Sequence, residues 1–254
     1  MVPVGSGLFG FQLETTIFKP PGDGPFPLLL MNHGKAPGNP HFQKRARYEV
    51  ISEEFVKRGY AVVIPMRKGF SQSGGLYVDG GCNIEGNGRA QAEDVKAVLD
   101  FVLAQSWADK NRIVIAGQSH GGLTTMALGA TNLPGVKGLI NFAGGLRIDN
   151  CAWKPSLVDA FANFGALTKV PSIWFYGAND SYFNPEVAAK MFAAYNGAGG
   201  HAKLIAYGPF KNDSHGMSSS ADGVVIWWPE TEQFLQSIGM PTALTPATAS
   251  ADQE

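Results

Sequence analysis

The sequence predicts a single α/β domain in which helices cover both faces of a mostly parallel sheet. Three observations point to this fold class. Short apolar runs that suit strands buried on both faces alternate with helical patterns along most of the chain. The chain has 254 residues, the size of one such domain, and 44% of them are hydrophobic, enough for a large core. Only 16% are charged, so much of the chain is expected to be buried.

The strands are predicted from short apolar runs bounded by turn residues. Residues 9–18 are strand-like and end at a turn rich in proline and glycine, 20–25. The run AVVI at 61–64 has no polar side, which is typical of a strand covered on both faces. Further strands are predicted, in order, at residues 28–31, 113–116, 139–143, 172–176 and 203–206.

The helices are predicted from apolar residues that recur every three or four positions. The pattern over 47–58 stops at Gly59, a residue type common just beyond a helix end. Residues 90–105 form the clearest helix, with apolar side chains on one face and acids near its start. Further helices are predicted at 120–129 and 186–195, and a last one passes through 234–235.

No linker interrupts this alternation, so residues 1–241 are predicted to form one domain. Residues 242–254 are small, polar and interrupted by proline, which predicts a disordered tail.

Charge and hydropathy exclude several classes of protein. The formal net charge of −1 argues against a nucleic-acid binder, which would carry a basic excess. No stretch approaches the roughly 18 apolar residues of a membrane helix. The first residues, MVPVG, lack the basic and apolar regions of a secretory signal. We therefore expect a cytoplasmic monomer or small homo-oligomer acting on a small molecule. A periplasmic or secreted protein whose signal has been removed is the alternative.

The cysteines and histidines predict no metal site. Cys82 and Cys151 are too few for a zinc site without help from histidine, and the five histidines have no metal-binding spacing. The two cysteines flank loops that could meet, so a disulfide is one alternative, and two free thiols are the expectation. The sequence predicts neither a metal nor another cofactor.

A nucleophile is predicted directly after the strand at 113–116. The sequence GQSHGG at 117–122 fits the pattern G-x-S-x-G, in which two glycines leave room for a sharp strand-to-helix turn. Such a turn lifts the Ser119 hydroxyl clear of the sheet. Catalytic groups of parallel sheets lie at the carboxyl ends of the strands, which is where Ser119 falls.

A serine nucleophile needs a base, and the base needs a third group to hold it. Asp180 directly follows the strand at 172–176, where a carboxylate would project into the site. His215 follows the strand at 203–206, so acid and histidine come after the serine in the order that one class of serine hydrolases uses. Other candidates are expected at turns or on the surface: Asp149, Asp159, Asp213 and His201.

Two backbone N–H groups are predicted to bind the oxyanion that forms during attack. The N–H of His120 lies at the start of the helix after Ser119. The second donor is expected in the loop after the strand at 28–31, where Gly34 permits close approach, and Lys35 N–H is the candidate. His33 is expected to pack beneath this loop as a structural residue.

Five segments carry a resemblance to a known superfamily: NHG at 32–34, RKGFSQSGG at 67–75, GQSHGG at 117–122, YGAND at 176–180 and HG at 215–216. Together and in this order they resemble the α/β-hydrolase superfamily, most closely its dienelactone-hydrolase-like branch with the prolyl-oligopeptidase-like esterases. Dienelactone hydrolases proper use a cysteine nucleophile, whereas this chain has Ser119. The resemblance implies an eight-stranded, mostly parallel sheet, a Ser119–His215–Asp180 triad and hydrolysis of esters through an acyl-enzyme.

The substrate is expected to be a small or medium carboxylic ester. Residues 144–171 have the length of a short lid, and Arg67 is expected to serve the fold. The aromatic residues predicted to line the pocket are Phe70, Tyr77, Trp153, Phe161, Tyr182 and Phe183. The same residues leave open a lactonase or thioesterase, a peptidase of the same fold, and a hydrolase-fold receptor with little turnover.

Overall fold

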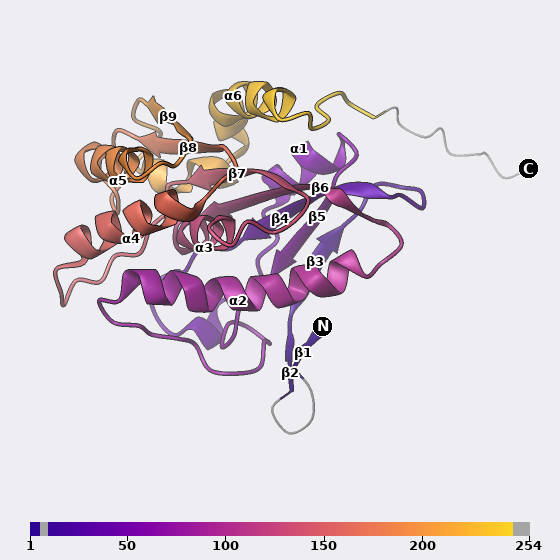
Figure 1. Cartoon of the computed structure of the whole chain (residues 1–254), viewed down its shortest axis with the longest axis horizontal. Helices are drawn as coiled ribbons and strands as arrows, with labels where there is room; N and C mark the ends of the chain where they lie inside the picture. The colour runs from indigo at the N-terminus through magenta and orange to yellow at the C-terminus, as the bar shows by residue number, and fades with distance from the viewer. Residues whose placement is uncertain (6–9, 246–254) are drawn as a thin grey trace, which may run out of the picture.

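One sheet of seven strands forms the centre of the molecule (Figure 1). The structure, a computed structural model, describes residues 1–5 and 10–245. In chain order the strands are β3 (Thr15–Phe18), β4 (Phe26–Asn32), β5 (Ala61–Pro65), β6 (Ala108–Gln118), β7 (Val136–Phe142), β8 (Ser172–Gly177) and β9 (Ala202–Tyr207). Their order across the sheet is β3-β5-β4-β6-β7-β8-β9. Only β3 is antiparallel to its neighbour, so the predicted mostly parallel α/β fold is confirmed.

Eight strands were expected in this sheet, and that number is wrong. The strand-like segment 9–18 divides at Glu14 into β2 (Phe11–Leu13) and β3. Strand β2 pairs with β1 (Val2–Val4) in a separate two-stranded sheet, and only β3 joins the main one, where it pairs with β5. The seven strands predicted from apolar runs each contribute one strand to the main sheet, so the eighth strand implied by the resemblance is the one that is missing there.

Helices cover both faces of the sheet, as Figure 1 shows. Helices α1 (Glu49–Val56) and α6 (Val224–Ser237) lie on one face, and four others lie on the opposite side. These four are α2 (Ile84–Leu103), α3 (His120–Gly129), α4 (Trp153–Leu167) and α5 (Pro185–Gly197). Short 3-10 helices are η2 (Pro40–Phe42), η3 (Ser214–Ser219) and η4 (Ala221–Gly223). Within the described ranges, no helix has both the length and the apolar character to cross a membrane.

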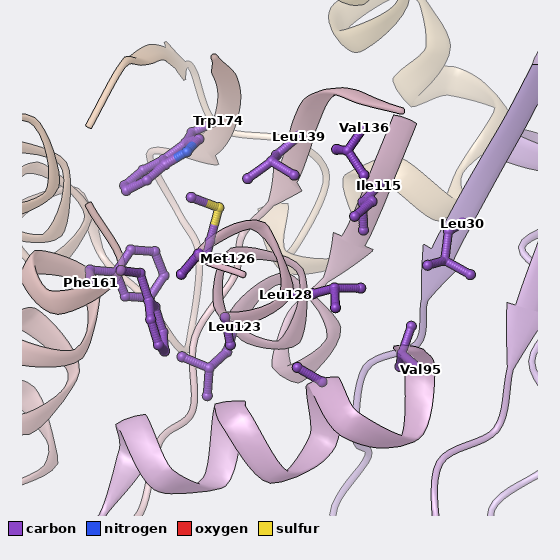
Figure 2. Close-up of a cluster of buried hydrophobic side chains, with 14 of the residues drawn as sticks. Leu30, Val95, Ile115, Leu123, Met126, Leu128, Val136, Leu139, Phe161 and Trp174 are labelled. Carbon is purple, nitrogen blue, oxygen red and sulfur yellow. The ribbon is translucent and has the colours of Figure 1, made fainter. Parts of the chain in front are cut away.

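The strands bury apolar side chains on both faces, as their uninterrupted apolar sequences predict. Along β4, Leu28 and Leu30 point to the face of α2, while Leu29 and Met31 point to the face of α1 and α6. The cluster on the first face is shown in part in Figure 2, where Leu123 and Met126 of α3 project toward neighbouring elements. This two-sided burial fixes the sheet and therefore the carboxyl ends of its strands.

The helical part of residues 144–171 does not form a lid, which corrects the expectation for this segment, while residues 145–147 and 149 line a cleft beside Ser119. They contain α4, and α4 packs beside α2 and α5 in the layer that covers the sheet (Figure 1). Phe161 and Leu157 of α4 are fully buried in the core on that face. A helix whose apolar side is already buried against the sheet is not available to close over a site.

The first residues of the predicted disordered tail are ordered. Thr245 donates to the carbonyl of Lys57 from both its N–H (2.9 Å) and its hydroxyl (3.0 Å), and Arg58 Nε donates to the carbonyl of Thr242 (3.1 Å). These bonds hold residues 242–245 against the end of α1. The rest of the predicted tail, 246–254, lies outside the described residues.

Cys82 and Cys151 form a disulfide, so the expectation of two free thiols is wrong. The cysteines are separated by 69 residues, but they precede α2 and α4, which pack side by side. Their Cα atoms are 6.1 Å apart, a normal spacing for a disulfide. The Ser156 hydroxyl of α4 also donates to the carbonyl of Cys82 (2.6 Å), which ties the first turn of α4 to the loop before α2.

Replacing Cys82 and Cys151 together by serine is expected to lower the free energy of unfolding by about 2–4 kcal/mol, because the crosslink restricts the unfolded chain. Urea denaturation of the oxidised protein, the reduced protein and the double variant measures this. Equal midpoints for the oxidised protein and the double variant would contradict it.

Candidate active site

Ser119 lies on a sharp turn between β6 and α3. Its backbone has φ 56° and ψ −124°, a left-handed φ that is unusual for a residue other than glycine. Two residues before and two residues after Ser119 there is no room for a side chain, because a Cβ at Gly117 would meet the backbone of Gly121, and one at Gly121 would meet that of Asn32. Strained backbone of this kind is common where a side chain must be presented for function. The turn leaves Ser119 at the carboxyl edge of the sheet.

His215 and Asp180, predicted as base and acid, lie in contact. His215 Nδ1 is 3.1 and 3.0 Å from the two carboxylate oxygens of Asp180. The carboxylate itself is buried and accepts bonds from the backbone N–H groups of Tyr182 (2.8 Å) and Phe183 (2.9 Å). Tyr182 also packs against the imidazole, with ring centroids 4.4 Å apart. These contacts fix the orientation of the ring, and Nε2 is the nitrogen that faces away from Asp180.

Asp213 lies beside the same histidine but caps its loop. Its carboxylate accepts from the N–H of His215 (2.9 Å), the first turn of η3, and from the N–H (3.2 Å) and hydroxyl (2.6 Å) of Ser181. Burial opposes ionisation, but these hydrogen bonds and the nearby histidine together lower the pKa of Asp213. Its predicted place at a turn agrees with this geometry.

Ser119 and His215 line one cleft, which has a volume of about 870 Å³. A second cleft of about 520 Å³ shares Ser119, Lys35 and Tyr182 with the first and also contains His120. No hydrogen bond joins Ser119 to His215 in the part of the chain that the structure describes. The structure thus brings all five predicted catalytic and oxyanion residues to two adjoining clefts, with Asp180 behind His215.

The two predicted oxyanion donors have N–H groups without an acceptor among the described residues. On either side of Lys35, the N–H of Gly34 donates to the Tyr48 hydroxyl (3.0 Å) and that of Ala36 to Gln43 Oε1 (3.0 Å), which hold the loop. His120 is the first residue of α3, so its N–H group has no carbonyl partner within that helix. Both N–H groups are therefore available to an anion beside Ser119.

A buried polar network connects the loop after β4, which carries Lys35, to the turn after β6, which carries Ser119 and His120. The guanidinium of Arg67 is fully buried and donates to Gln91 Oε1 (2.8 Å) and to the carbonyl of His33 (2.6 Å). Its Nη2 lies 3.3 Å from Nδ1 of His120, whose Nε2 is 2.6 Å from Asn87 Oδ1. Burial lowers the pKa of Arg67 to about 10, so it remains charged at neutral pH. Arg67 and His33 are structural residues, as their sequence context predicts.

The two buried histidines are expected to make stability depend on pH. Burial, followed by the charge of Arg67, lowers the pKa of His33 and of His120 well below 6.5. Between that range and about pH 6.5 only the unfolded chain binds these protons, so stability is present at higher pH and is lost as the pH falls. The two histidines together contribute a slope of up to about 2.7 kcal/mol per pH unit.

Urea denaturation between pH 7.5 and pH 5 measures this slope. The variant His120→Asn is expected to have a shallower slope than the wild type, while His41→Asn is the matched control because His41 is exposed. Parallel pH dependences for the wild type and His120→Asn would contradict the assignment.

Sequence reasoning missed Tyr48 and Gln118. Gln118 Nε2 donates to the carbonyl of His215 (3.0 Å), and the Tyr48 hydroxyl lies 3.4 Å from Gln118 Oε1 while accepting from Gly34 N–H. These three bonds connect the loop that carries His215 to the loop that carries Lys35. Gln118 is the variable position of the G-x-S-x-G pattern, and Tyr48 lies on another loop, so no local signal marks them.

The predicted aromatic pocket is only partly correct. Tyr182 lines both clefts, Phe183 lines the smaller one, and Trp153 lines a neighbouring cavity of about 330 Å³ with Tyr182. Three aromatic residues are placed differently: Phe70 is fully buried against His33, Phe161 is fully buried against Trp174, and Tyr77 packs against Phe70 and His120. Phe70 and Phe161 fill the interior and do not line the clefts, whereas Tyr77 is half-buried, with its ring 5.7 Å from the ammonium of Lys35.

Comparison with known proteins agrees with this architecture. A family model described as X-Pro dipeptidyl-peptidase (S15 family) matches residues 10–154, more than half of the chain. Cocaine esterase from Rhodococcus sp. (strain MB1 Bresler) is 30% identical over 147 residues, which is 55% of this chain and 22% of the esterase. The chain therefore corresponds to less than a quarter of that relative's length.

Solved structures share the fold at low identity. A putative dienelactone hydrolase from Klebsiella pneumoniae subsp. pneumoniae MGH 78578 has a TM-score of 0.61 at 19% identity, covering 88% of this chain and 92% of its own. Est1E from Butyrivibrio proteoclasticus, solved with ferulic acid, has a TM-score of 0.65 at 18% identity, covering 90% and 96%. Acylaminoacyl peptidase from Pyrococcus horikoshii has a TM-score of 0.70 at 14% identity, covering 97% and 42%. The chain has the α/β-hydrolase fold and belongs to the X-Pro dipeptidyl-peptidase (S15) family.

Proposed function

We propose that the protein is a serine carboxylesterase that hydrolyses small or medium esters through an acyl-enzyme. The observation that carries the proposal is the meeting of three parts at two adjoining clefts that share Ser119: a serine on a strained turn, a histidine held by a buried carboxylate, and two N–H groups that have no acceptor among the described residues. This arrangement suits nucleophilic attack on a carbonyl carbon.

In the proposed reaction, His215 Nε2 takes the hydroxyl proton of Ser119 as Oγ bonds to the ester carbonyl carbon. Asp180 holds the imidazole in the required tautomer and stabilises its charged form. The N–H groups of Lys35 and His120 bind the oxyanion, at roughly 3–4 kcal/mol per donor in comparable sites. The bond to the alcohol oxygen then breaks, and His215 returns the proton to the leaving alcohol.

The second half of the reaction repeats the same chemistry with water. His215 removes a proton from water as its oxygen bonds to the acyl carbon, and Ser119 leaves with that proton as the carboxylic acid is released. The bond between Ser119 and His215 is required in both halves. Such bonds are often long until substrate binds, so the relative placement of the two residues on one cleft is sufficient for the proposal.

A peptidase is the second candidate, because the matching family model describes a dipeptidyl-peptidase. A dipeptidyl-peptidase must recognise the ammonium group at the start of its substrate, which requires a carboxylate. The acids that line the clefts, Glu49 and Asp149, are already paired with Arg47 (3.1 Å) and Arg147 (2.6 Å). The cleft therefore offers an ammonium group little compensation, and this favours the esterase.

Stopped-flow hydrolysis of p-nitrophenyl acetate and butyrate tests the proposal. We expect a burst of p-nitrophenol equal to the concentration of active sites, followed by steady turnover. The p-nitroanilide of Gly-Pro provides the comparison for the peptidase. A burst without turnover would indicate a receptor-like protein, and faster cleavage of the anilide than of the esters would establish the second candidate.

Tyr48 and Gln118 are expected to act together in positioning the site. Gln118→Met removes the bonds to His215 and Tyr48, and Tyr48→Phe removes those to Gly34 and Gln118. Each change is expected to lower kcat/KM by roughly 10- to 100-fold, because small displacements of catalytic groups are costly. The losses are expected to be less than additive in the double variant, since both changes break one chain of contacts. Fully additive losses in this double-mutant cycle would show that the two residues act separately.

A further inference from the structure

The charged side chains along the two clefts are mostly basic. The clefts are lined by four basic and two acidic residues: Lys35, Lys44, Arg47, Arg147, Glu49 and Asp149. The whole chain has a formal net charge of −1, so the excess of positive charge is local to the clefts. A cleft lined by one sign of charge raises the local concentration of ligands of the other sign.

Pairing leaves the two lysines as the source of this excess. Glu49 Oε1 lies 3.1 Å from Arg47 Nε, and Asp149 Oδ1 lies 2.6 Å from Arg147 Nε, so both acids are matched by arginines. Among the described residues, neither Lys35 nor Lys44 has a carboxylate within ion-pair distance. The lysine charges are therefore available to a ligand.

Lys35 lies closest to the proposed chemistry. It lines both clefts together with Ser119, whereas Lys44 lines only the larger cleft. The ammonium of Lys35 lies 3.5 and 3.4 Å from the carbonyl oxygens of Ala36 and Gly38, and 5.7 Å from the centroid of the Tyr77 ring. These groups orient the ammonium without neutralising its charge.

We infer that the cleft selects esters that carry a carboxylate in addition to the ester group. This inference rests on the proposed esterase function and names its substrate class. A carboxylate beside the scissile bond would form charge-assisted hydrogen bonds with the lysine ammonium groups. The carboxylate can belong to the acyl group or to the alcohol, and the position of Lys35 on both clefts permits either.

Two pairs of substrates, matched in size, test the inference. For the acyl side, 4-nitrophenyl hydrogen adipate is compared with 4-nitrophenyl methyl adipate, in which the second carboxylate is masked. For the alcohol side, 4-acetoxybenzoate is compared with 4-acetoxybenzamide. We expect kcat/KM to be higher for the anionic member of at least one pair, and the pair that shows the preference identifies the side that carries the charge. The preference should fall as ionic strength rises from 0.05 to 0.5 M, because salt screens exposed charges.

The variants Lys35→Gln and Lys44→Gln are each expected to lower the ratio of anionic to neutral kcat/KM by about two- to five-fold. The ratio is the readout because it cancels effects common to both esters, and both substitutions leave the backbone N–H groups in place. Lys110→Gln removes the same charge from β6 at a position nine residues before Ser119, about 30 Å away along the strand, and is expected to leave the ratio unchanged.

Hydrolysis of the neutral esters with no preference for the anionic ones would overturn the selectivity alone. A preference that persists in the variant carrying both Lys35→Gln and Lys44→Gln would overturn the assignment of these lysines. Failure to hydrolyse any of the esters would overturn the proposed function and the selectivity with it.

Discussion

Replacing Ser119 by alanine is expected to lower kcat for ester hydrolysis by about 10⁴- to 10⁶-fold. The change removes the only atom that bonds to the substrate in the proposed reaction, so the burst of p-nitrophenol should disappear with the turnover. The residual rate measures how much the backbone N–H groups and substrate binding accelerate direct attack of water on the ester. Stopped-flow measurement at saturating p-nitrophenyl butyrate gives both quantities.

Ser219→Ala is the matched control for this variant. Ser219 lines the same cleft and follows His215 by four residues, but it is exposed and takes no part in the proposed reaction. Its substitution is expected to leave kcat within a factor of about two, since surface changes of this kind cost little. Full esterase activity in Ser119→Ala, with a fold unchanged by circular dichroism, would overturn the assignment of the nucleophile.

Asp180→Asn is expected to lower kcat by about 10⁴-fold, nearly as much as loss of the nucleophile. The carboxylate accepts from His215 Nδ1, whereas an amide can present its NH₂ group and favour the wrong tautomer of the ring. Asparagine can still accept from the N–H groups of Tyr182 and Phe183, so the loop should keep its shape. The loss is therefore expected in kcat with little change in thermal stability.

The variant Asp213→Asn tests whether the orientation of the His215 ring, and not the conformation of its loop, accounts for the effect of Asp180→Asn. Asp213 contacts the backbone of His215 and not its ring, and asparagine caps a turn about as well as aspartate. Its kcat is expected to fall much less than that of Asp180→Asn. Similar losses in the two variants would mean that the negative charge near His215 matters more than the contact with Nδ1, and would contradict the proposed role of Asp180.

Some residues of the site lie where short sequence patterns predict them: Ser119 on the turn after β6, and Asp180 and His215 after later strands. The helix expected at 120–129 is α3 with the same limits, because glycines and a buried strand before it define the turn at Ser119. Asp180 and His215 each follow a strand of the parallel sheet, so the fold brings them to the same edge. Their contact also needs β8 and β9 to be neighbours in the sheet, which the structure shows and the apolar runs alone do not predict.

The parts that depend on distant contacts could not be predicted in the same way. Tyr48 contacts Gln118 across 70 residues, and Gln118 contacts His215 across 97. The disulfide requires α2 and α4 to be neighbours, and no pattern in the sequence near Cys82 or Cys151 predicts that packing. The sequence predicts this helix from residue 90, whereas α2 begins at Ile84, because Gly86 and Gly88 weaken the helical pattern of its first turns. Aromatic residues such as Phe161 look the same in sequence whether they fill the core or line a cleft.

Lys35 combines the proposed backbone donor with a side chain on a residue that lines both clefts, and the two can change independently. Any residue other than proline at position 35 supplies the N–H group, so mutation there alters which esters are accepted without removing the proposed stabilisation of the oxyanion. If the protein is the proposed esterase, its descendants are expected to change substrate through a series of single substitutions at this loop while each intermediate keeps the backbone N–H group.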